Sequence, residues 1–214
     1  MALDILLVRH GETEWNSLRR IQGQLDIPLN DIGLGQARAI ARRLGASRVA
    51  AVYTSDLLRA SQTAEPIAAA CGRVALPDRR LRERHFGSLQ GSYYETLQRT
   101  DPERHRRMLS RDLTFDMDGG ETLQALHERV CEIMAEIADR HREGSIVVVA
   151  HGGVLDSCYR LASGLALDAP RTYGLFNASL NTIAYDGDGF QLISWGDVTH
   201  LGAAADEIDT RLLN

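Results

Sequence analysis

Two histidines with matching surroundings are the residues of this chain best suited to chemistry. His10, which follows Arg9, and His151 each precede a glycine. Apolar runs at residues 5–8 and 145–150 lead into them, and such runs are typical of strands buried on both faces. A guanidinium or imidazole group at the end of a buried strand is costly to desolvate without a compensating partner. The pattern therefore predicts either an anion site or a strand end satisfied by protein carboxylates and carbonyls.

A second arginine, Arg59, falls in the first turn of a helix that we expect to be capped by Ser55 or Asp56. A cation is unfavourable there, because the helix dipole is positive at its N-terminus. One interpretation is a solvated arginine paired with Asp56 or Glu65. We favour the other, in which the guanidinium and the helix N-terminus converge on one anion.

These groups together favour a phosphoryl ligand. Ligands of open α/β sheets bind beyond the carboxyl ends of the strands, where both histidines would lie. The glycine after each histidine lets an oxyanion approach the backbone closely. Two imidazoles and two guanidiniums suit phosphoryl transfer, which depends on positioning and charge stabilisation.

Other chemistries fit less well. The histidine spacing matches no zinc motif, and two neighbouring arginines would repel a divalent cation, so we expect no metal site. No G-x-S-x-G occurs, which disfavours a serine hydrolase. All 24 basic residues are arginine, and the absence of lysine excludes a Walker A lysine, a Schiff base and a catalytic amine.

Composition sets wider limits. The chain has 214 residues, of which 44% are hydrophobic, and we expect one α/β domain over residues 1–214. A net charge of −5 with interspersed signs argues against nucleic acid or an anionic membrane as partner. Three scattered cysteines, no basic leader and no membrane-length apolar stretch predict a cytoplasmic protein with reduced thiols. The sequence leaves open whether the chain forms a homo-oligomer.

Strand and helix patterns alternate along the chain. The predicted strands span residues 5–8, 49–54, 145–150, 179–185 and 190–195. The predicted helices span residues 31–44, 56–70, 119–141 and 154–163, with helical pieces over 93–109 that break at Asp101 and Pro102. We expect residues 76–86 to form a short strand that leads into an exposed loop, and a polar, loosely held tail from Ala203 onward.

Four motifs carry a resemblance to a known family. They are R-H-G-E-T-E-W-N at 9–16, S-D-L-L-R-A-S-Q-T-A-E at 55–65, E-R-H-F-G at 83–87 and A-H-G-G at 150–153. In this order they resemble the histidine phosphatase superfamily, also called phosphoglycerate mutase-like, over residues 3 to about 200. The resemblance implies a three-layer α/β/α sandwich with a mostly parallel central sheet, and catalysis without metal or other cofactor.

The resemblance also implies a role for each matched residue. His10 would attack phosphorus and become transiently phosphorylated, while Arg9, Arg59 and His151 hold the equatorial oxygens. Glu83, which only the resemblance singles out, would protonate the leaving oxygen and then deprotonate water. The positions that line the phosphate pocket in relatives are Thr13, Asn16, Gln22, Gly23 and Gly152.

Arginines on both sides of Glu83 are unfavourable for a general acid, because cations disfavour the protonated carboxyl group. Alternation along an extended segment would allow Glu83 to face inward while Arg82 and Arg84 face outward. Arg84 is also the position at which a mutase-like relative could bind a substrate carboxylate.

The family divides between hydrolases and isomerases, and the motifs are mixed. Residues 20–30 resemble the phosphatase branch, whereas residues 83–91 look like 2,3-bisphosphoglycerate-dependent mutases. Such mutases carry a lysine after this motif, an Arg-Arg segment that leads into prolines, and a longer lid; here Arg106 and Arg107 precede no proline. Water should then reach the phosphohistidine. We therefore predict a phosphomonoesterase acting on a small phosphorylated metabolite, with a mutase as the alternative and a non-catalytic phosphate-binding module as a remote third hypothesis.

Overall fold

One six-stranded sheet, in the order β3-β2-β4-β1-β5-β6, forms the centre of the computed structural model, which describes residues 2–204. The strands are β1 (Leu3–Arg9), β2 (Val52–Thr54), β3 (Ala75–Pro77), β4 (Gly144–Ala150), β5 (Leu180–Tyr185) and β6 (Phe190–Asp197). The first four are parallel to one another, whereas β5 and β6 are antiparallel to their neighbours. The prediction of a mostly parallel sheet is confirmed.

The register of the two central strands determines where the histidines lie. Arg9 at the end of β1 is opposite Ala150 at the end of β4. The next residue on each strand is a histidine, and the His10 amide donates to the Ala150 carbonyl over 2.9 Å. Both histidines therefore lie at one edge of the sheet, as predicted.

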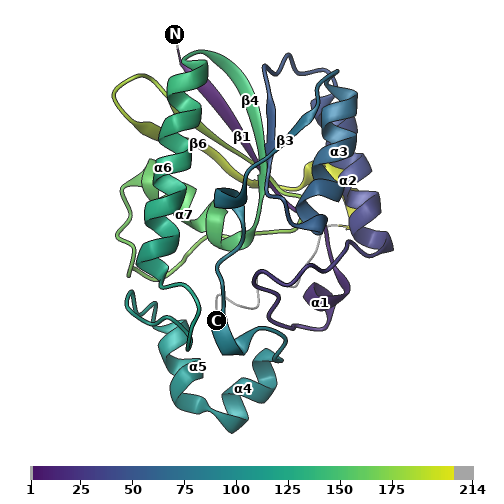
Figure 1. Ribbon diagram of the computed structural model, residues 1–214. Helices are drawn as coiled ribbons and strands as arrows, with labels where there is room; N and C mark the ends of the chain where they lie inside the picture. The colour runs from purple at the N-terminus through teal and green to yellow at the C-terminus, as the bar shows by residue number, and fades with distance from the viewer. Residues whose placement is uncertain (1, 205–214) are drawn as a thin grey trace.

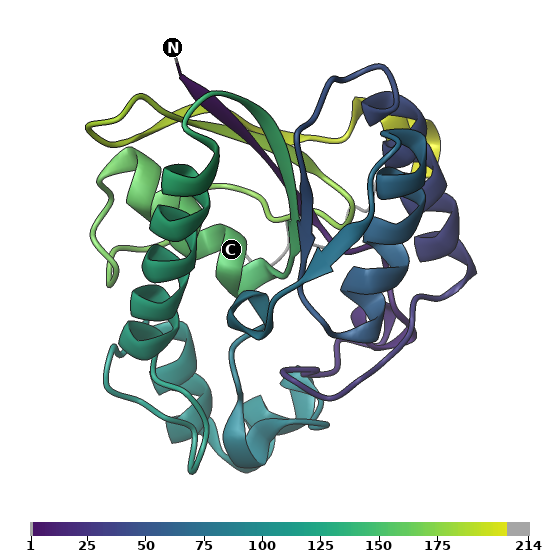
Figure 2. The ribbon, with the colours of Figure 1, turned by 45° about the horizontal axis from the view of Figure 1, so that its top comes forward.

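Helices cover both faces of the sheet (Figures 1 and 2). On one side α2 (Asp31–Leu44) and α3 (Leu58–Ala70) pack against a core that includes Val8 and Ile40. On the other side α6 (Leu123–His141) and α7 (Gly152–Ser163) pack against a core that includes Leu7 and Ile133. Alternate residues of β1 thus face opposite layers, and the three-layer α/β/α expectation is confirmed.

Short helices close the end of the sheet that carries the histidines (Figure 1). They are α1 (Glu14–Ser17), α4 (Tyr94–Thr100) and α5 (Pro102–Leu109), with 3₁₀ turns η1 (Arg79–Leu81) and η2 (Gly87–Leu89). A third buried cluster, which includes Ile21, Leu97 and Met117, holds this part together. The break before Pro102 is confirmed, and the Asp101 side chain caps α5.

Several boundaries differ from those predicted. Helix α3 begins at Leu58 without a side-chain cap from Ser55 or Asp56; instead the Asp26 carboxylate accepts from the Leu58 amide over 2.6 Å. Helix α6 begins after a Thr122 cap rather than at residue 119.

The short strand expected at the start of residues 76–86 is present as β3, but the rest of the segment is not the exposed loop that we expected. Leu81 is fully buried and Arg84 is 7% exposed. The segment lies inside because Leu81 packs in the core cluster that includes residues of α6, and because the Glu83 carboxylate accepts a hydrogen bond from the Gly153 amide of α7.

The tail expected from Ala203 lies outside the described residues, except that Ala203 and Ala204 end the turn η3 (Thr199–Ala204). Within residues 2–204 no helix is long and apolar enough to cross a membrane.

Candidate active site

The His10 ring is held with one nitrogen free for attack. Its Nδ1 lies 2.7 Å from the Gly11 carbonyl oxygen. Because a carbonyl oxygen only accepts, Nδ1 carries the proton and Nε2 retains its lone pair. Burial lowers the pKa of His10 well below 6.5, and the Arg59 and Arg9 charges lower it further. His10 is therefore neutral at neutral pH, with a fixed tautomer whose Nε2 lone pair is available.

His151 lies beside His10, with their ring centroids 5.1 Å apart. It is fully buried, and neither of its ring nitrogens has a hydrogen-bond partner in the described part of the chain. Burial lowers its pKa well below 6.5, with contributions from Arg59, His10 and Arg9. A buried, unsatisfied polar group costs about 1–3 kcal/mol. Such a group indicates a site prepared for a ligand.

Arg59 is a buried cation that the protein holds through backbone carbonyls. Its Nη1 donates to the Leu25 oxygen over 2.9 Å and its Nη2 to the Gly23 oxygen over 2.7 Å. The side chain is 1% exposed, and burial lowers its pKa to about 10, so it stays charged at neutral pH.

The surroundings of Arg59 correct one expectation. The N-terminal amide of α3 is taken by Asp26, so helix and guanidinium do not converge on a substrate anion through that amide. The alternative pairing of Arg59 with Asp56 is also wrong, since Asp56 binds Arg82. At this point of the pocket the positive charge comes from the Arg59 guanidinium and not from the Leu58 amide.

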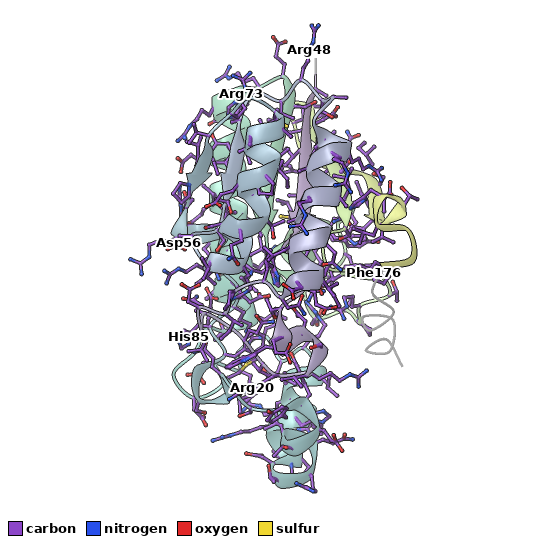
Figure 3. The ribbon with its side chains drawn as sticks, turned by 90° about the vertical axis from the view of Figure 1, so that its right-hand side faces the viewer. Arg20, Arg48, Asp56, Arg73, His85 and Phe176 are labelled. Carbon is purple, nitrogen blue, oxygen red and sulfur yellow. The ribbon has the colours of Figure 1, made fainter. Side chains whose placement is uncertain are left out.

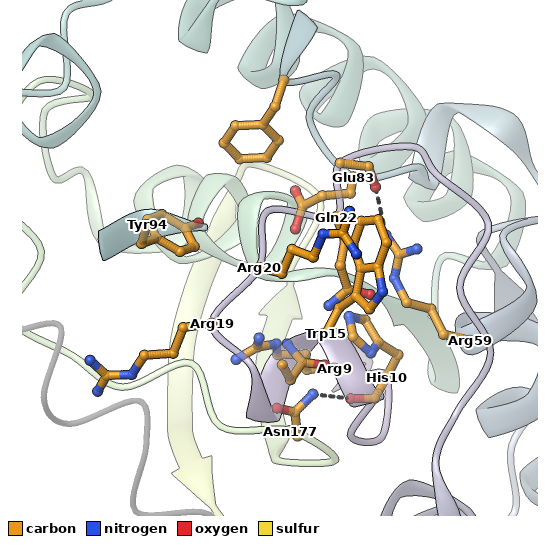
Figure 4. A pocket seen from close by; sticks show the side chains of 13 residues that line it. Arg9, His10, Trp15, Arg19, Arg20, Gln22, Arg59, Glu83, Tyr94 and Asn177 are labelled. Atoms are coloured by element: carbon orange, nitrogen blue, oxygen red, sulfur yellow. Dashed lines mark hydrogen bonds between the residues drawn. The ribbon is translucent and has the colours of Figure 1, made fainter. Parts of the chain in front are cut away.

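Arg9 and His10 are fixed by the loop that leads into β5. The Arg9 Nη1 donates to the Leu175 carbonyl. The buried Asn177 side chain donates to the His10 carbonyl over 2.9 Å (Figure 4). We did not predict Asn177. The antiparallel direction of β5 places its beginning beside the histidines, and recognising that direction from the sequence would have pointed to it.

The Glu83 carboxylate is held at the N-terminus of α7. The Gly153 amide lies 3.0 and 3.2 Å from its two oxygens, and the Arg84 amide donates to Oε1 over 2.8 Å. Gln24 and Arg129 donate to the Glu83 carbonyl. This network aims the side chain into the space beside His10 (Figure 4).

The arginines that flank Glu83 behave differently from one another. Arg82 faces outward and pairs with Asp56, as expected of an alternating segment. The expectation for Arg84 is wrong: its guanidinium is buried and donates to the Glu121 and Phe115 carbonyls. These two backbone carbonyls compensate the buried Arg84 guanidinium by accepting its hydrogen bonds, so no carboxylate partner is needed.

The first pocket, of about 150 Å³, brings most of the predicted site residues together (Figure 4). It is lined by Arg9, His10, Trp15, Asn16, Arg19, Arg20, Gln22, Gly23, Arg59, Glu83, Phe86, Tyr94 and Asn177. Thr13 does not line it, because its side chain caps α1 in a reciprocal pair with Asn16. Arg84 and Gly152 line an adjoining second pocket, and His151, which is in ring contact with His10, is not among the residues that line either pocket.

Gly11, which follows His10, lies against the backbone of α2. A Cβ on Gly11 would lie 2.6 Å from the Gly33 carbonyl oxygen. Close packing where the loop passes α2 therefore requires a glycine at position 11.

The site as a whole is built to bind an anion. Four arginines and His10 line the first pocket with one carboxylate, His151 is in ring contact with His10, and no group of three His, Cys, Asp or Glu side chains within residues 2–204 is placed to hold a metal ion. A phosphoryl group suits the guanidiniums, and its leaving oxygen suits Glu83.

Comparisons with known proteins agree with this geometry. The model of the histidine phosphatase superfamily (branch 1) matches residues 5–198. The chain is 43% identical to phosphoglycerate mutase-like protein 4 of Arabidopsis thaliana, over 92% of this chain and 86% of that protein. It is 41% identical to the metal-independent phosphoserine phosphatase of the same plant, over 94% and 84%. A mycobacterial glucosyl-3-phosphoglycerate phosphatase structure superposes with a TM-score of 0.82 at 30% identity, over 91% of this chain and 99% of that one.

The match spans nearly the whole described chain and includes every motif that carries the pocket. The chain therefore belongs to the histidine phosphatase superfamily and is an enzyme of phosphoryl transfer or hydrolysis.

Proposed function

We propose that this protein hydrolyses the phosphate monoester of a small metabolite through a phosphohistidine at His10. The observation that carries the proposal is the His10 ring itself. Its Nδ1 proton is bound to a backbone carbonyl, its Nε2 is free, and two guanidiniums lie in the same pocket. A fixed tautomer beside preorganised positive charge is what attack on phosphorus requires.

In the first step, the His10 Nε2 forms a bond to phosphorus while the bond from phosphorus to the ester oxygen breaks. Glu83 gives its proton to that oxygen, and the alcohol leaves. Arg9, Arg59 and His151 hold the equatorial oxygens as their charge redistributes. The orphaned nitrogens of His151 then gain the partner that they lack in the free enzyme.

In the second step, water attacks the phosphohistidine from the side that the alcohol has left. Glu83 takes the proton of the water, the bond between nitrogen and phosphorus breaks, and inorganic phosphate is released. Glu83 lines both pockets, which supports a role for one carboxylate with the leaving alcohol and then with water.

Two features favour hydrolysis over transfer between hydroxyl groups. The first is the absence of the lysine that mutases carry after the E-R-H-F-G motif. The second is the Arg106 and Arg107 pair on α5, the place of the mutase Arg-Arg segment. Arg106 pairs with Glu103 over 2.7 Å and Arg107 with Asp112 over 2.6 Å, and neither lines the catalytic pocket or the adjoining second pocket. This arginine pair is therefore not placed to retain an intermediate in either pocket.

A mutase is the second candidate. It is supported by the E-R-H-F-G sequence at residues 83–87 and by the 43% identity to a protein named phosphoglycerate mutase-like. Phosphoserine is the first ester to test for the phosphatase, because a relative that is 41% identical is named for that activity.

The deciding experiment measures phosphate release and isomer conversion in parallel. The protein is incubated with phosphoserine, 3-phosphoglycerate, 2,3-bisphosphoglycerate and a panel of sugar and nucleoside phosphates, with His10→Ala as the blank. We expect phosphate release that disappears in the blank. Rapid interconversion of 2- and 3-phosphoglycerate with little free phosphate would establish the mutase instead. If no ester is turned over, the hypothesis of a non-catalytic phosphate-binding module would be favoured.

We also propose that the protein works in the cytoplasm. Cys71, Cys131 and Cys158 are all free thiols, and reduced thiols are the rule in that compartment. Fractionation of cells that express the tagged protein would test this proposal.

A further inference from the structure

A second pocket of about 500 Å³ adjoins the catalytic pocket. The two pockets share Arg9, Glu83, Phe86 and Tyr94. In the proposed reaction Glu83 protonates the leaving oxygen, so the leaving group must extend from Glu83. The second pocket is the space into which it can extend.

We infer that Arg171 binds a second anionic group on the leaving part of the substrate and so determines which esters the enzyme accepts. This inference rests on the proposed phosphatase function and deepens it. The substrate class is a phosphate monoester whose alcohol carries a further negative charge, either a carboxylate or a second phosphate.

The balance of charge in the second pocket supports an anion. Four arginines line it, Arg9, Arg84, Arg111 and Arg171, against the two carboxylates of Glu83 and Asp156. Asp156 is bound by Arg111, by Arg160 and by the Tyr173 hydroxyl, so these arginines balance its charge, and Arg9, Arg84 and Arg171 remain against Glu83. A net positive pocket attracts an anionic ligand.

Among the arginines that the second pocket adds to the catalytic one, only Arg171 is uncommitted. Arg84 donates to the Phe115 and Glu121 carbonyls, and Arg111 donates to Asp156 and the Leu167 carbonyl. Arg171 is half-buried and, within residues 2–204, takes part in no hydrogen bond or ion pair. A free guanidinium at a pocket wall is ready to bind an anion through two parallel hydrogen bonds.

The segment that carries Arg171 is anchored. Pro170 precedes it and restricts the backbone. Two residues later, Tyr173 stacks on Tyr159 of α7 with ring centroids 3.5 Å apart, and its hydroxyl donates to Asp156 over 2.8 Å. Arg171 is therefore presented from a fixed loop, which reduces the entropy lost when a ligand is ordered.

The remaining wall of the second pocket fits a carbon skeleton. It includes Met108 and Leu109 of α5, Leu123 and Leu126 of α6, and Leu175. Apolar side chains between Glu83 and a free arginine suit a short organic body that joins the ester oxygen to a second anion.

The test compares paired substrates in three variants. Phosphoserine and phosphoethanolamine differ by one carboxylate, and glucose 1,6-bisphosphate and glucose 6-phosphate differ by one phosphate. Arg171→Gln is compared with Arg171→Lys, which keeps the charge, and with Arg48→Gln. Arg48 is exposed and lies at the opposite end of the molecule from Arg20 of the catalytic pocket (Figure 3).

We expect Arg171→Gln to lower kcat/KM about tenfold or more for the anionic member of one pair, while the other member changes by less than about twofold. The pair that responds identifies the carboxylate or the phosphate. Arg171→Lys should recover part of the loss, and Arg48→Gln should match the wild type. Circular dichroism of each variant establishes that it is folded.

Equal losses on both members of each pair, or no loss on any, would overturn the inference. So would a wild-type enzyme that hydrolyses only esters without a second anion, or a misfolded Arg171→Gln together with a folded Arg171→Ala that shows no selective loss. Failure of the proposed function is different: the wild type would then release no more phosphate than His10→Ala from any ester.

Discussion

Replacing Gly153 with alanine should lower the catalytic rate while leaving the stability of the fold nearly unchanged. Gly153 lies in the first turn of α7, and its amide donates to both oxygens of Glu83. A Cβ at this position would lie 2.4 Å from the Glu83 Oε1 and 3.1 Å from the Leu126 Cδ2. The Leu126 methyl group can shift, whereas Glu83 is held by its own backbone contacts to Gln24 and Arg129.

The distances set the size of the expected effect. Ordinary contact begins at 3.4 Å, so the Glu83 carboxyl group must move by about 1 Å. A displacement of about 1 Å can reduce catalysis about 100-fold. Alanine in place of glycine inside a helix stabilises it by about 0.5–1 kcal/mol, so we expect a Tm within about 4 °C of the wild type.

The assay uses esters with good and poor leaving groups. With an alkyl phosphate, which needs a proton on its leaving oxygen, Gly153→Ala should lose about 100-fold in kcat. With p-nitrophenyl phosphate it should retain the first burst of nitrophenolate, because that oxygen leaves without help. Gly35→Ala in α2 is the control for alanine inside a helix, since its Cβ would meet nothing within 4 Å. Hydrolysis of the alkyl ester by folded Gly153→Ala within threefold of the wild-type rate would refute the reasoning.

Three further substitutions test other parts of the site. Arg59→Lys keeps the charge but loses the paired bonds to two carbonyls, so kcat/KM should fall about 100-fold; steady-state kinetics within threefold of the wild type would count against the role of the guanidinium. The pKa of His151 lies below 6.5 in the folded enzyme, so the unfolded chain binds more protons and the free energy of unfolding should decrease as the pH falls through 6.5. Urea unfolding at pH 7.5 and 5.5 should show a smaller decrease for His151→Gln, and an identical decrease would contradict this account. Gly11→Ala should destabilise the fold by about 1–3 kcal/mol, because its Cβ would meet a backbone oxygen at 2.6 Å. Gly35→Ala, whose Cβ meets nothing within 4 Å, is the control, and equal unfolding midpoints for the two variants would contradict it.

Elements with strong local signals were predicted well. The helix over residues 31–44 has a polar cap, an apolar face and a terminal glycine, and the structure places it at Asp31–Leu44 with an Asn30 cap. Segments whose conformation depends on distant partners were predicted poorly. Residues 76–86 are rich in charge and resemble an exposed loop, yet backbone carbonyls from other elements draw Arg84 inside.

The sequence by itself determined the layered fold and the meeting of His10 with His151. Two buried strand patterns that end in the same residue types are local features, and parallel pairing brings their ends to one edge. With Arg59, they already indicated a phosphoryl site.

Only the tertiary structure decided how those groups are held and what lies beside them. The hydrogen bond from Asn177 to the His10 carbonyl, the hydrogen bond from the Gly153 amide to Glu83, and the second pocket with Arg171 all arise from contacts between residues far apart in the chain. Such contacts leave no periodic pattern in a sequence, because each depends on which backbone groups the folded chain leaves available.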